Sequence, residues 1–187
     1  MENDIINAAE VLGKGGLILY PTDTIWGIGC DATNEKAVEK IYALKRRETG
    51  KSLLVLLDDA SKLNRFVSNI PDIAFTLIEV SDKPLTIIFD GAQNLAENVM
   101  ASDGSIGIRI VKDEFCRRLL RKFGKPVVST SANYSGIKWP SQFKEIDKGL
   151  IGKVDYVVSW GQNLPGHSKP SGIIKLGSNG EVKVIRE

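Results

Sequence analysis

The chain has 187 residues, of which 42% are hydrophobic and 26% charged, so it can bury one sizeable core, and we expect a single domain over 1–187. Its 25 Lys and Arg nearly balance 23 Asp and Glu, which excludes a nucleic-acid binder that works through overall charge. The longest apolar runs, such as 53–57, fall far short of the roughly 18 residues that a membrane span needs. Residues 1–4 are acidic and polar, unlike a secretory signal. We therefore expect a cytoplasmic protein without a membrane segment.

Apolar periodicity, caps and turn residues predict an alternation of helices and strands. The first half is expected to hold a helix over 4–12, a strand over 17–20, a polar loop over 21–32, a helix that Asn34 caps and 45–47 end, and a strand over 53–57. After these come helical stretches near 60–66 and 71–79, strands near 85–89 and 106–111, a helix over 113–123, a strand over 126–129, a polar helix near 141–149, and strands near 154–158, 171–176 and 181–186.

Helices that interleave with strands, followed by a hairpin around the turn 177–180, favour one architecture. It is an α/β (α+β) fold, in which layered helices cover a twisted sheet with both parallel and antiparallel pairs.

Three familiar site patterns fail on their spacing. Gly50-Lys51-Ser52 lacks the first glycine of a P-loop, because position 45 is lysine. Gly27-x-Gly29 is no dinucleotide fingerprint, because position 32 is alanine. Cys30 and Cys116 lie far apart without a C-x-x-C pair, which supports neither a zinc site nor a disulfide framework, and we expect both in the core.

Polar segments at the ends of predicted strands and helices remain as candidate sites. The loop 21–32 gathers hydroxyls, a carboxylate and glycines at a strand end, where α/β sheets bind ligands, although it could be an ordinary turn. The segment 45–51 holds four cations in seven residues. This cluster suits a polyphosphate, or else complements the helix dipole.

A third segment, 126–136, brings six side chains with hydroxyl or amide groups to the end of a strand. These groups can orient phosphate or carboxylate oxygens but cannot serve as a base at neutral pH, so positioning is favoured over proton transfer. The single histidine, His167, lies in a Gly/Ser/Pro loop and is expected on the surface. The basic helix over 113–123 is expected to be solvated, with RNA contact as the alternative. The cations in and around it are Lys112, Arg117, Arg118, Arg121, Lys122 and Lys125.

Taken in order, these segments resemble the YrdC-like threonylcarbamoyl-AMP synthase family in its single-domain form. The resemblance is carried by Pro21-Thr22-Asp23-Thr24 with Gly27-x-Gly29, Lys45-x-Arg47 followed by Lys51, Pro84-x-Thr86, Gly107-x-Arg109, the run 129–136 and Ser171. It implies a YrdC-like fold. It also implies that the protein joins L-threonine, bicarbonate and ATP into threonylcarbamoyl-AMP, with release of pyrophosphate, for the threonylcarbamoyladenosine modification of tRNA.

The resemblance also implies roles for single residues. Catalytic roles fall to Lys45, Arg47, Ser131 and Asn133, and these four would bind ATP together with Lys51 and Ser105. Threonine would be held by Thr24, Arg109, Ser129 and Ser171, with Arg109 facing its carboxylate. No metal would be held by the protein alone, and Mg²⁺ would come with ATP. The implied partners are tRNA or double-stranded RNA and a downstream tRNA threonylcarbamoyl transferase complex.

Some positions depart from the family pattern. Trp26 replaces a tyrosine, Asp82-Lys83 replace Pro-Gly, Leu56 stands where some members have histidine, and Gly172 replaces a threonine. Two other functions stay open. One is a carbamoyl-transfer module like that of hydrogenase-maturation proteins, although the accompanying zinc-finger cysteines and acylphosphatase region are missing. The other is a non-catalytic double-stranded-RNA or ribosome-binding protein, which only the basic clusters support.

Overall fold

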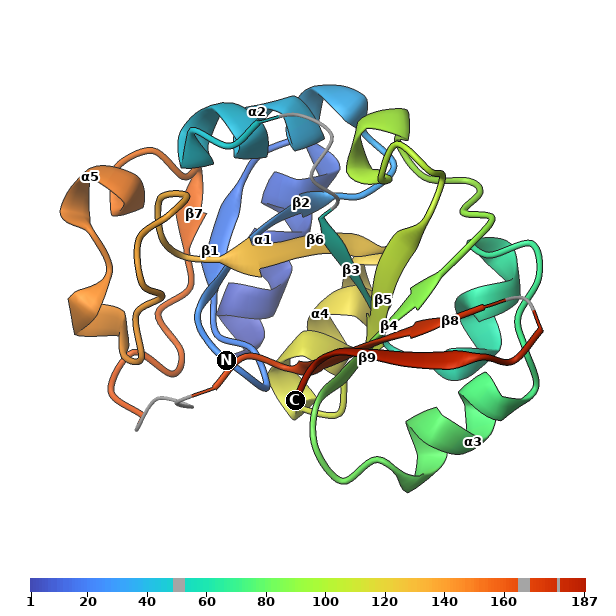
Figure 1. Cartoon of the computed structure of the whole chain (residues 1–187). Helices are drawn as coiled ribbons and strands as arrows, with labels where there is room; N and C mark the ends of the chain where they lie inside the picture. Colours follow the sequence, from blue (N-terminus) through green and yellow to red (C-terminus); the bar gives the residue numbers. More distant parts are fainter. Residues whose placement is uncertain (49–52, 165–168, 178) are drawn as a thin grey trace.

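The computed structural model describes residues 1–48, 53–164, 169–177 and 179–187 (Figure 1). Within them, one mixed sheet runs in the order β7-β1-β2-β6-β3-β5-β4-β8-β9. Its strands are β1 Ile18–Tyr20, β2 Gly27–Asp31, β3 Leu54–Leu57, β4 Leu85–Phe89, β5 Ile106–Ile110, β6 Val127–Ser131, β7 Tyr156–Val157, β8 Gly172–Leu176 and β9 Val182–Arg186. Parallel pairs such as β3–β5 and antiparallel pairs such as β3–β6 occur side by side. The predicted mixed sheet is therefore confirmed.

The helices begin and end at the polar caps and glycines that the sequence supplies. Asn34 accepts a hydrogen bond from Ala37 N at the start of α2, and Asp113 accepts one from Cys116 N at the start of α4. Gly124, with φ of 77°, ends α4 in the left-handed conformation that glycine adopts easily. The helices are α1 Glu2–Gly13, α2 Glu35–Lys45, α3 Ile73–Val80, α4 Glu114–Phe123 and α5 Lys148–Ile151, with 3-10 turns η1 Ala60–Arg65, η2 Glu97–Val99 and η3 Phe143–Glu145.

Helices cover both faces of the sheet. Apolar residues of α1 and α4 pack on one face with Leu56 and Val127, and this cluster includes Cys116. Residues of α2 pack on the other face with Val55 and Val128, and that cluster includes Cys30. Figure 1 shows α2 above the strands, with α1 and α4 behind them. Both cysteines are core residues, as the sequence predicts.

The loop predicted over 21–32 is wrong in its second half, where 27–31 form the buried strand β2. Glycines usually indicate a turn, but Gly29 lies within a strand and allows neighbouring groups to approach its backbone closely. A Cβ built on Gly29 would lie 2.8 Å from both Val128 O and the Tyr20 ring. The sheet therefore accepts no side chain at this position.

Two other boundaries differ from the prediction. Strand β6 runs on to Ser131 rather than ending at 129, because Thr130 and Ser131 pair with Ile28 and Gly27. The helix predicted near 141–149 is instead split into η3 and α5, since Asp147 starts a new cap by accepting from Gly149 N and Leu150 N. The short turn η2 was not predicted. No helix in the described parts of the chain is long and apolar enough to cross a membrane.

Candidate active site

A cavity of about 210 Å³ lies on the sheet face that also carries the α1 and α4 cluster. Leu54 pairs with Ser129, while Leu56 pairs with both Val127 and Arg109, so the alternation of the strands places all of these side chains on one face. Beyond the edge of the helices this face is open. There the loop after β1, the end of α2, β6 and the β8–β9 hairpin surround the cavity.

Hydroxyls and arginines dominate the polar part of the described lining. The hydroxyls belong to Thr22, Thr24, Ser129, Thr130, Ser131 and Ser171, and the cations are Arg47, Arg109 and Arg186. Ile25, Leu53, Leu54, Trp139, Pro170 and Ile173 give the apolar part. Among these described residues there is no carboxylate and no imidazole, so the cavity is built to hold anions rather than to move protons.

The loop after β1 orients two hydroxyls. Thr22 Oγ1 donates to Ile25 O at 2.8 Å and lies 2.9 Å from Thr24 Oγ1. Because the single Thr22 proton is used on Ile25, Thr24 is the donor in the second contact. The lone pairs of Thr24 are then available to a donor on a ligand, such as an ammonium or amide group.

Arg109 forms the buried floor of the cavity. Its Nη2 lies 3.0 Å from Asp23 Oδ1, and only 2% of the residue is exposed. Arg109 Nε is buried and finds no hydrogen-bond acceptor among the described residues. An unsatisfied buried donor costs about 1–3 kcal/mol, so the fold holds this guanidinium in place at a cost in stability.

Ser171 and Arg186 form another part of the cavity lining. Ser171 Oγ lies 2.8 Å from Thr86 Oγ1, and Arg186 donates to Ser171 O from Nε at 2.9 Å and from Nη2 at 2.8 Å. Burial, and to a smaller extent the charge of Arg109, lowers the pKa of Arg186 below its usual value. Two guanidinium groups in the lining of one cavity favour a bound anion.

The structure brings most of the expected site residues together, and the remaining ones lie elsewhere. Those that line the cavity are Thr24, Arg47, Arg109, Ser129, Ser131 and Ser171. Ser105 is outside the lining and donates its hydroxyl to Asp103 at 2.6 Å. Asn133 is also outside and donates from Nδ2 to Ile137 O. Lys51 lies outside the described residues.

Lys45, expected to touch phosphate, is buried beneath the end of β6. Its ammonium donates to Ser131 O, to Asn133 O at 2.7 Å and to Asn133 Oδ1 at 3.4 Å, and it is not part of the described lining. Burial, with a smaller contribution from the charge of Arg47, lowers the pKa of Lys45 to about 8.

The residue that sequence reasoning missed most clearly is Arg186. It reaches the cavity because it pairs with Ile173 across the C-terminal hairpin, where a register shift occurs between Ile173 and Ile174. An arginine near the end of an exposed strand gives no signal of this kind in the sequence. Thr86 was part of a recognised motif, but no role was assigned to it.

The departures from the family pattern all lie outside the described lining. Trp26 packs on Phe143 with ring centroids 4.9 Å apart, and Leu56 is in the core. A Cβ on Gly172 would meet Leu85 and Arg186 O rather than the cavity. Asp82 and Lys83 line a separate cavity of about 190 Å³.

Comparison with known proteins agrees with this arrangement. The family model described as "Telomere recombination" (Sua5_yciO_yrdC) matches residues 10–187. A threonylcarbamoyl-AMP synthase of Pseudoalteromonas translucida is 32% identical over 97% of each chain. A putative threonylcarbamoyl-AMP synthase of Methanocaldococcus jannaschii is 38% identical over 95% of this chain and 82% of the relative.

Solved structures share the fold. YciO of E. coli matches 100% of this chain and 90% of its own with a TM-score of 0.86 at 27% identity. P. abyssi Sua5, solved in complex with L-threonine, matches 92% of this chain with a TM-score of 0.82 at 24% identity, and this chain spans about half (50%) of its length. The match of the family model over nearly the whole chain, together with these relatives, shows that the protein belongs to the Sua5/YciO/YrdC family.

Proposed function

We propose that the protein is a threonylcarbamoyl-AMP synthase that acts as one YrdC-like domain in the cytosol. The observation that carries the proposal is the cavity itself, which gathers hydroxyls, Arg47, Arg109 and Arg186 without a described carboxylate or imidazole. Such a site can neutralise phosphates and a carboxylate and can fix their geometry. It cannot supply a strong base, and the proposed reaction needs none.

The reaction joins three substrates. The amine of L-threonine adds to bicarbonate with loss of water, which gives an N-carboxylate. An oxygen of this carboxylate forms a bond to the α-phosphorus of ATP while the bond to the β-phosphate oxygen breaks. Threonylcarbamoyl-AMP and pyrophosphate are the products, so catalysis rests on alignment and on charge neutralisation.

Threonine would bind at the floor of the cavity. Arg109 lines the cavity, and its guanidinium can donate to the α-carboxylate. Thr24 offers the lone pairs left by its contact with Thr22, which suits the amino group. Ser129 and Ser171 also line the cavity and would hold the remaining polar atoms.

ATP would lie toward the end of α2. Arg47 is half-buried in the lining there and Ser131 faces it from the end of β6, so both can contact phosphate oxygens. Contacts from Lys51, Ser105 and Asn133 to ATP remain predictions. Described lining residues include no carboxylate, and Mg²⁺ is usually held by one or two carboxylates with substrate phosphates. We therefore expect Mg²⁺ to arrive as part of the MgATP substrate, held by phosphate oxygens and water rather than by this lining.

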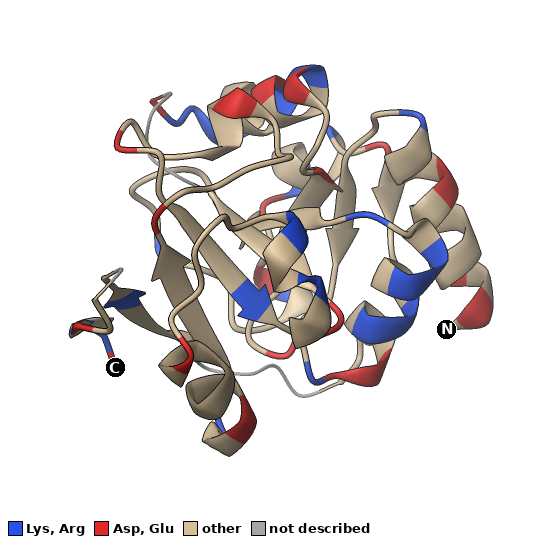
Figure 2. Cartoon of the chain, turned by 90° about the vertical axis from the view of Figure 1, so that its right-hand side faces the viewer, with Lys and Arg blue, Asp and Glu red and all other residues tan. Residues whose placement is uncertain are grey.

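The alternative of an RNA-binding protein rests on α4, whose cations Figure 2 shows gathered on one side of the molecule. Several of these charges are engaged within the chain. Arg118 pairs with Glu2 and Glu114, Arg121 Nε lies 3.6 Å from Asp58, and Lys125 Nζ lies 2.8 Å from Asp31. These pairs reduce the charge available to RNA, and the cavity favours the synthase. We expect the labile product to pass to a tRNA threonylcarbamoyl transferase complex.

The deciding experiment measures pyrophosphate release from MgATP by the purified protein. Release should require both L-threonine and bicarbonate, and Arg109→Met should abolish this threonine-dependent release. Release at the same rate without threonine would contradict the proposal. A carbamoyl-transfer module would not require L-threonine for pyrophosphate release, so the same assay separates the two functions.

A further inference from the structure

One residue at the end of α2 is bound to the segment 131–135 by both its side chain and its backbone. Lys45 Nζ donates to the carbonyl oxygens of Ser131 and Asn133 and lies 3.4 Å from the amide oxygen of Asn133. In return, Lys45 O accepts a hydrogen bond from Ser135 N at 3.0 Å. The segment is thus attached to α2 at its beginning, middle and end.

These contacts occupy the ammonium group. A lysine ammonium has three hydrogens, and the three acceptors around Lys45 can take all of them. The residue is 2% exposed and lies outside the described cavity lining. A phosphate could reach it only after one of these hydrogen bonds had broken.

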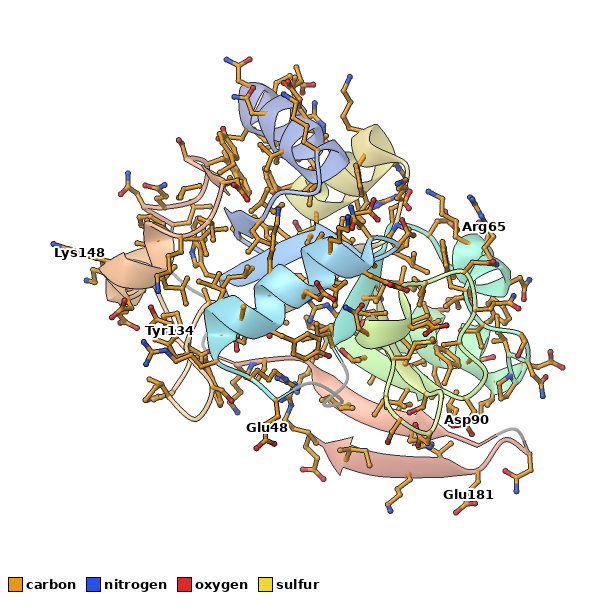
Figure 3. All side chains as sticks on the ribbon, turned by 90° about the horizontal axis from the view of Figure 1, so that it is seen from above. Glu48, Arg65, Asp90, Tyr134, Lys148 and Glu181 are labelled. Atoms are coloured by element: carbon orange, nitrogen blue, oxygen red, sulfur yellow. The ribbon has the colours of Figure 1, made fainter. Side chains whose placement is uncertain are left out.

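The backbone after Lys45 explains why Lys45 and Arg47, two residues apart, have different surroundings. Arg46 ends α2 in the left-handed conformation, with φ of 51°, and its guanidinium lies 5.2 Å from the centroid of the Tyr134 ring. Figure 3 shows Tyr134 beside this end of the helix. After the left-handed turn, Arg47 reaches the cavity lining. The alternation Lys-x-Arg therefore places one cation under the segment and the other in the cavity.

We infer that Lys45 is a positioning residue, which holds the 131–135 segment against α2 so that Ser131 keeps its place beside Arg47, while Arg47 alone of the pair contacts phosphate. The inference deepens the proposed function, and its kinetic part rests on that function. Ser131 is held from the other side as well, because Ala132 N donates to Trp26 O at 2.9 Å. Loss of the Lys45 side chain would leave Asn133 O without its described donor and Ser131 O with only Asn133 N at 2.9 Å, while the backbone bond from Ser135 N would remain.

The test uses Lys45→Met with Arg47→Met as the matched control, since both changes remove one cation from the same helix end. Amide hydrogen exchange is measured first, on the nucleotide-free protein. Lys45→Met should raise exchange in 132–135 by at least about tenfold and leave α1 and α4 protected, while Arg47→Met should not change this segment. Lys45→Gln keeps a hydrogen-bond donor, so it should give a smaller rise in the exchange of 132–135. This variant replaces Lys45→Met in the test if the methionine variant folds poorly.

Kinetics then separate positioning from a purely structural role. With active protein normalised by folded fraction, Lys45→Met should lower kcat on the order of 10²-fold, as misplacement by about 1 Å can do. KM for threonine should stay nearly unchanged, because Thr24, Arg109 and Ser171 lie on other elements. Arg47→Met should instead weaken MgATP binding more than Lys45→Met does.

Two results would overturn the inference. The first is unchanged exchange in 132–135 for Lys45→Met together with a loss of MgATP affinity equal to that of Arg47→Met. The second is a rise in exchange as large in α1 and α4 as in the segment. If the wild-type protein made no pyrophosphate at all, the proposed function would fail, but the exchange result would still decide the role of Lys45.

Discussion

The buried ion pair between Asp23 and Arg109 allows a quantitative prediction. The side chains are 10% and 3% exposed and their closest atoms are 3.0 Å apart. Asp23→Ala removes the carboxylate and leaves the guanidinium buried without its partner. Breaking a buried pair on one side costs about 3–5 kcal/mol. For a chain of this size, 1 kcal/mol shifts Tm by roughly 2–4 °C, so we expect Tm to fall by about 6–20 °C.

Thermal unfolding followed by circular dichroism measures this shift, with two comparison variants. Glu10→Ala breaks a surface pair with Lys14, whose side chains are 60% and 73% exposed, and should leave Tm unchanged within error. The double variant Asp23→Leu with Arg109→Met removes both charges and should recover most of the lost stability. If Asp23→Ala lowers Tm no more than Glu10→Ala does, burial of the pair does not control its energy, and this reasoning is refuted.

Three further predictions use other features. Gly29→Ala should destabilise the fold by about 1–3 kcal/mol, because its Cβ would meet Val128 O at 2.8 Å, whereas Gly13→Ala, with nothing within 4 Å, should be neutral or stabilising in urea titrations. Ser171→Ala should raise KM for threonine about tenfold and leave MgATP binding unchanged; equal effects on both substrates in steady-state assays would contradict the assignment. The pKa of Lys45 is about 8 in the folded protein against a usual 10.5, so the unfolded chain binds the proton more tightly between these values. The difference in free energy of unfolding between the wild type and Lys45→Met should therefore increase in favour of the wild type as the pH rises from 8 to 10.5. A difference that stays constant over this range would contradict the lowered pKa.

Elements with local signals could be predicted from the sequence. Helices α2 and α4 carry their own caps at Asn34 and Asp113, and the structure confirms both starts. Strand β2 could not be recognised, because the glycines that suggest a turn are there for the close approach of Tyr20 and Val128. The local sequence pattern indicates which secondary structure a segment favours by itself. The need for glycine at position 29 comes from packing against neighbouring strands, which the local pattern does not show.

The candidate site likewise contains residues that the sequence predicts and residues whose place depends on the fold. Residues in motifs at strand ends, such as Thr24, Ser129 and Ser131, were predicted and line the cavity. Arg186 was missed because its position depends on the register of the hairpin. Lys45 and Arg47 were recognised together, but the left-handed turn at Arg46 brings only Arg47 to the cavity, and a run of basic residues at a helix end does not indicate such a turn. Residue types could thus be chosen from the sequence, whereas side-chain direction required the fold.

The hydroxyls around the cavity have a consequence for the lifetime of the folded state. Thr24 lies near the beginning of the chain and Ser171 near its end, and only tertiary structure brings them to one cavity. A substrate bound by both Thr24 and Ser171 would link two segments that are distant in the sequence. Local unfolding of either segment would then require the substrate to dissociate. Stabilisation by a ligand grows with its concentration relative to Kd. Proteolysis that proceeds through partial opening should therefore slow when threonine is bound, which makes resistance to protease a simple report of occupancy.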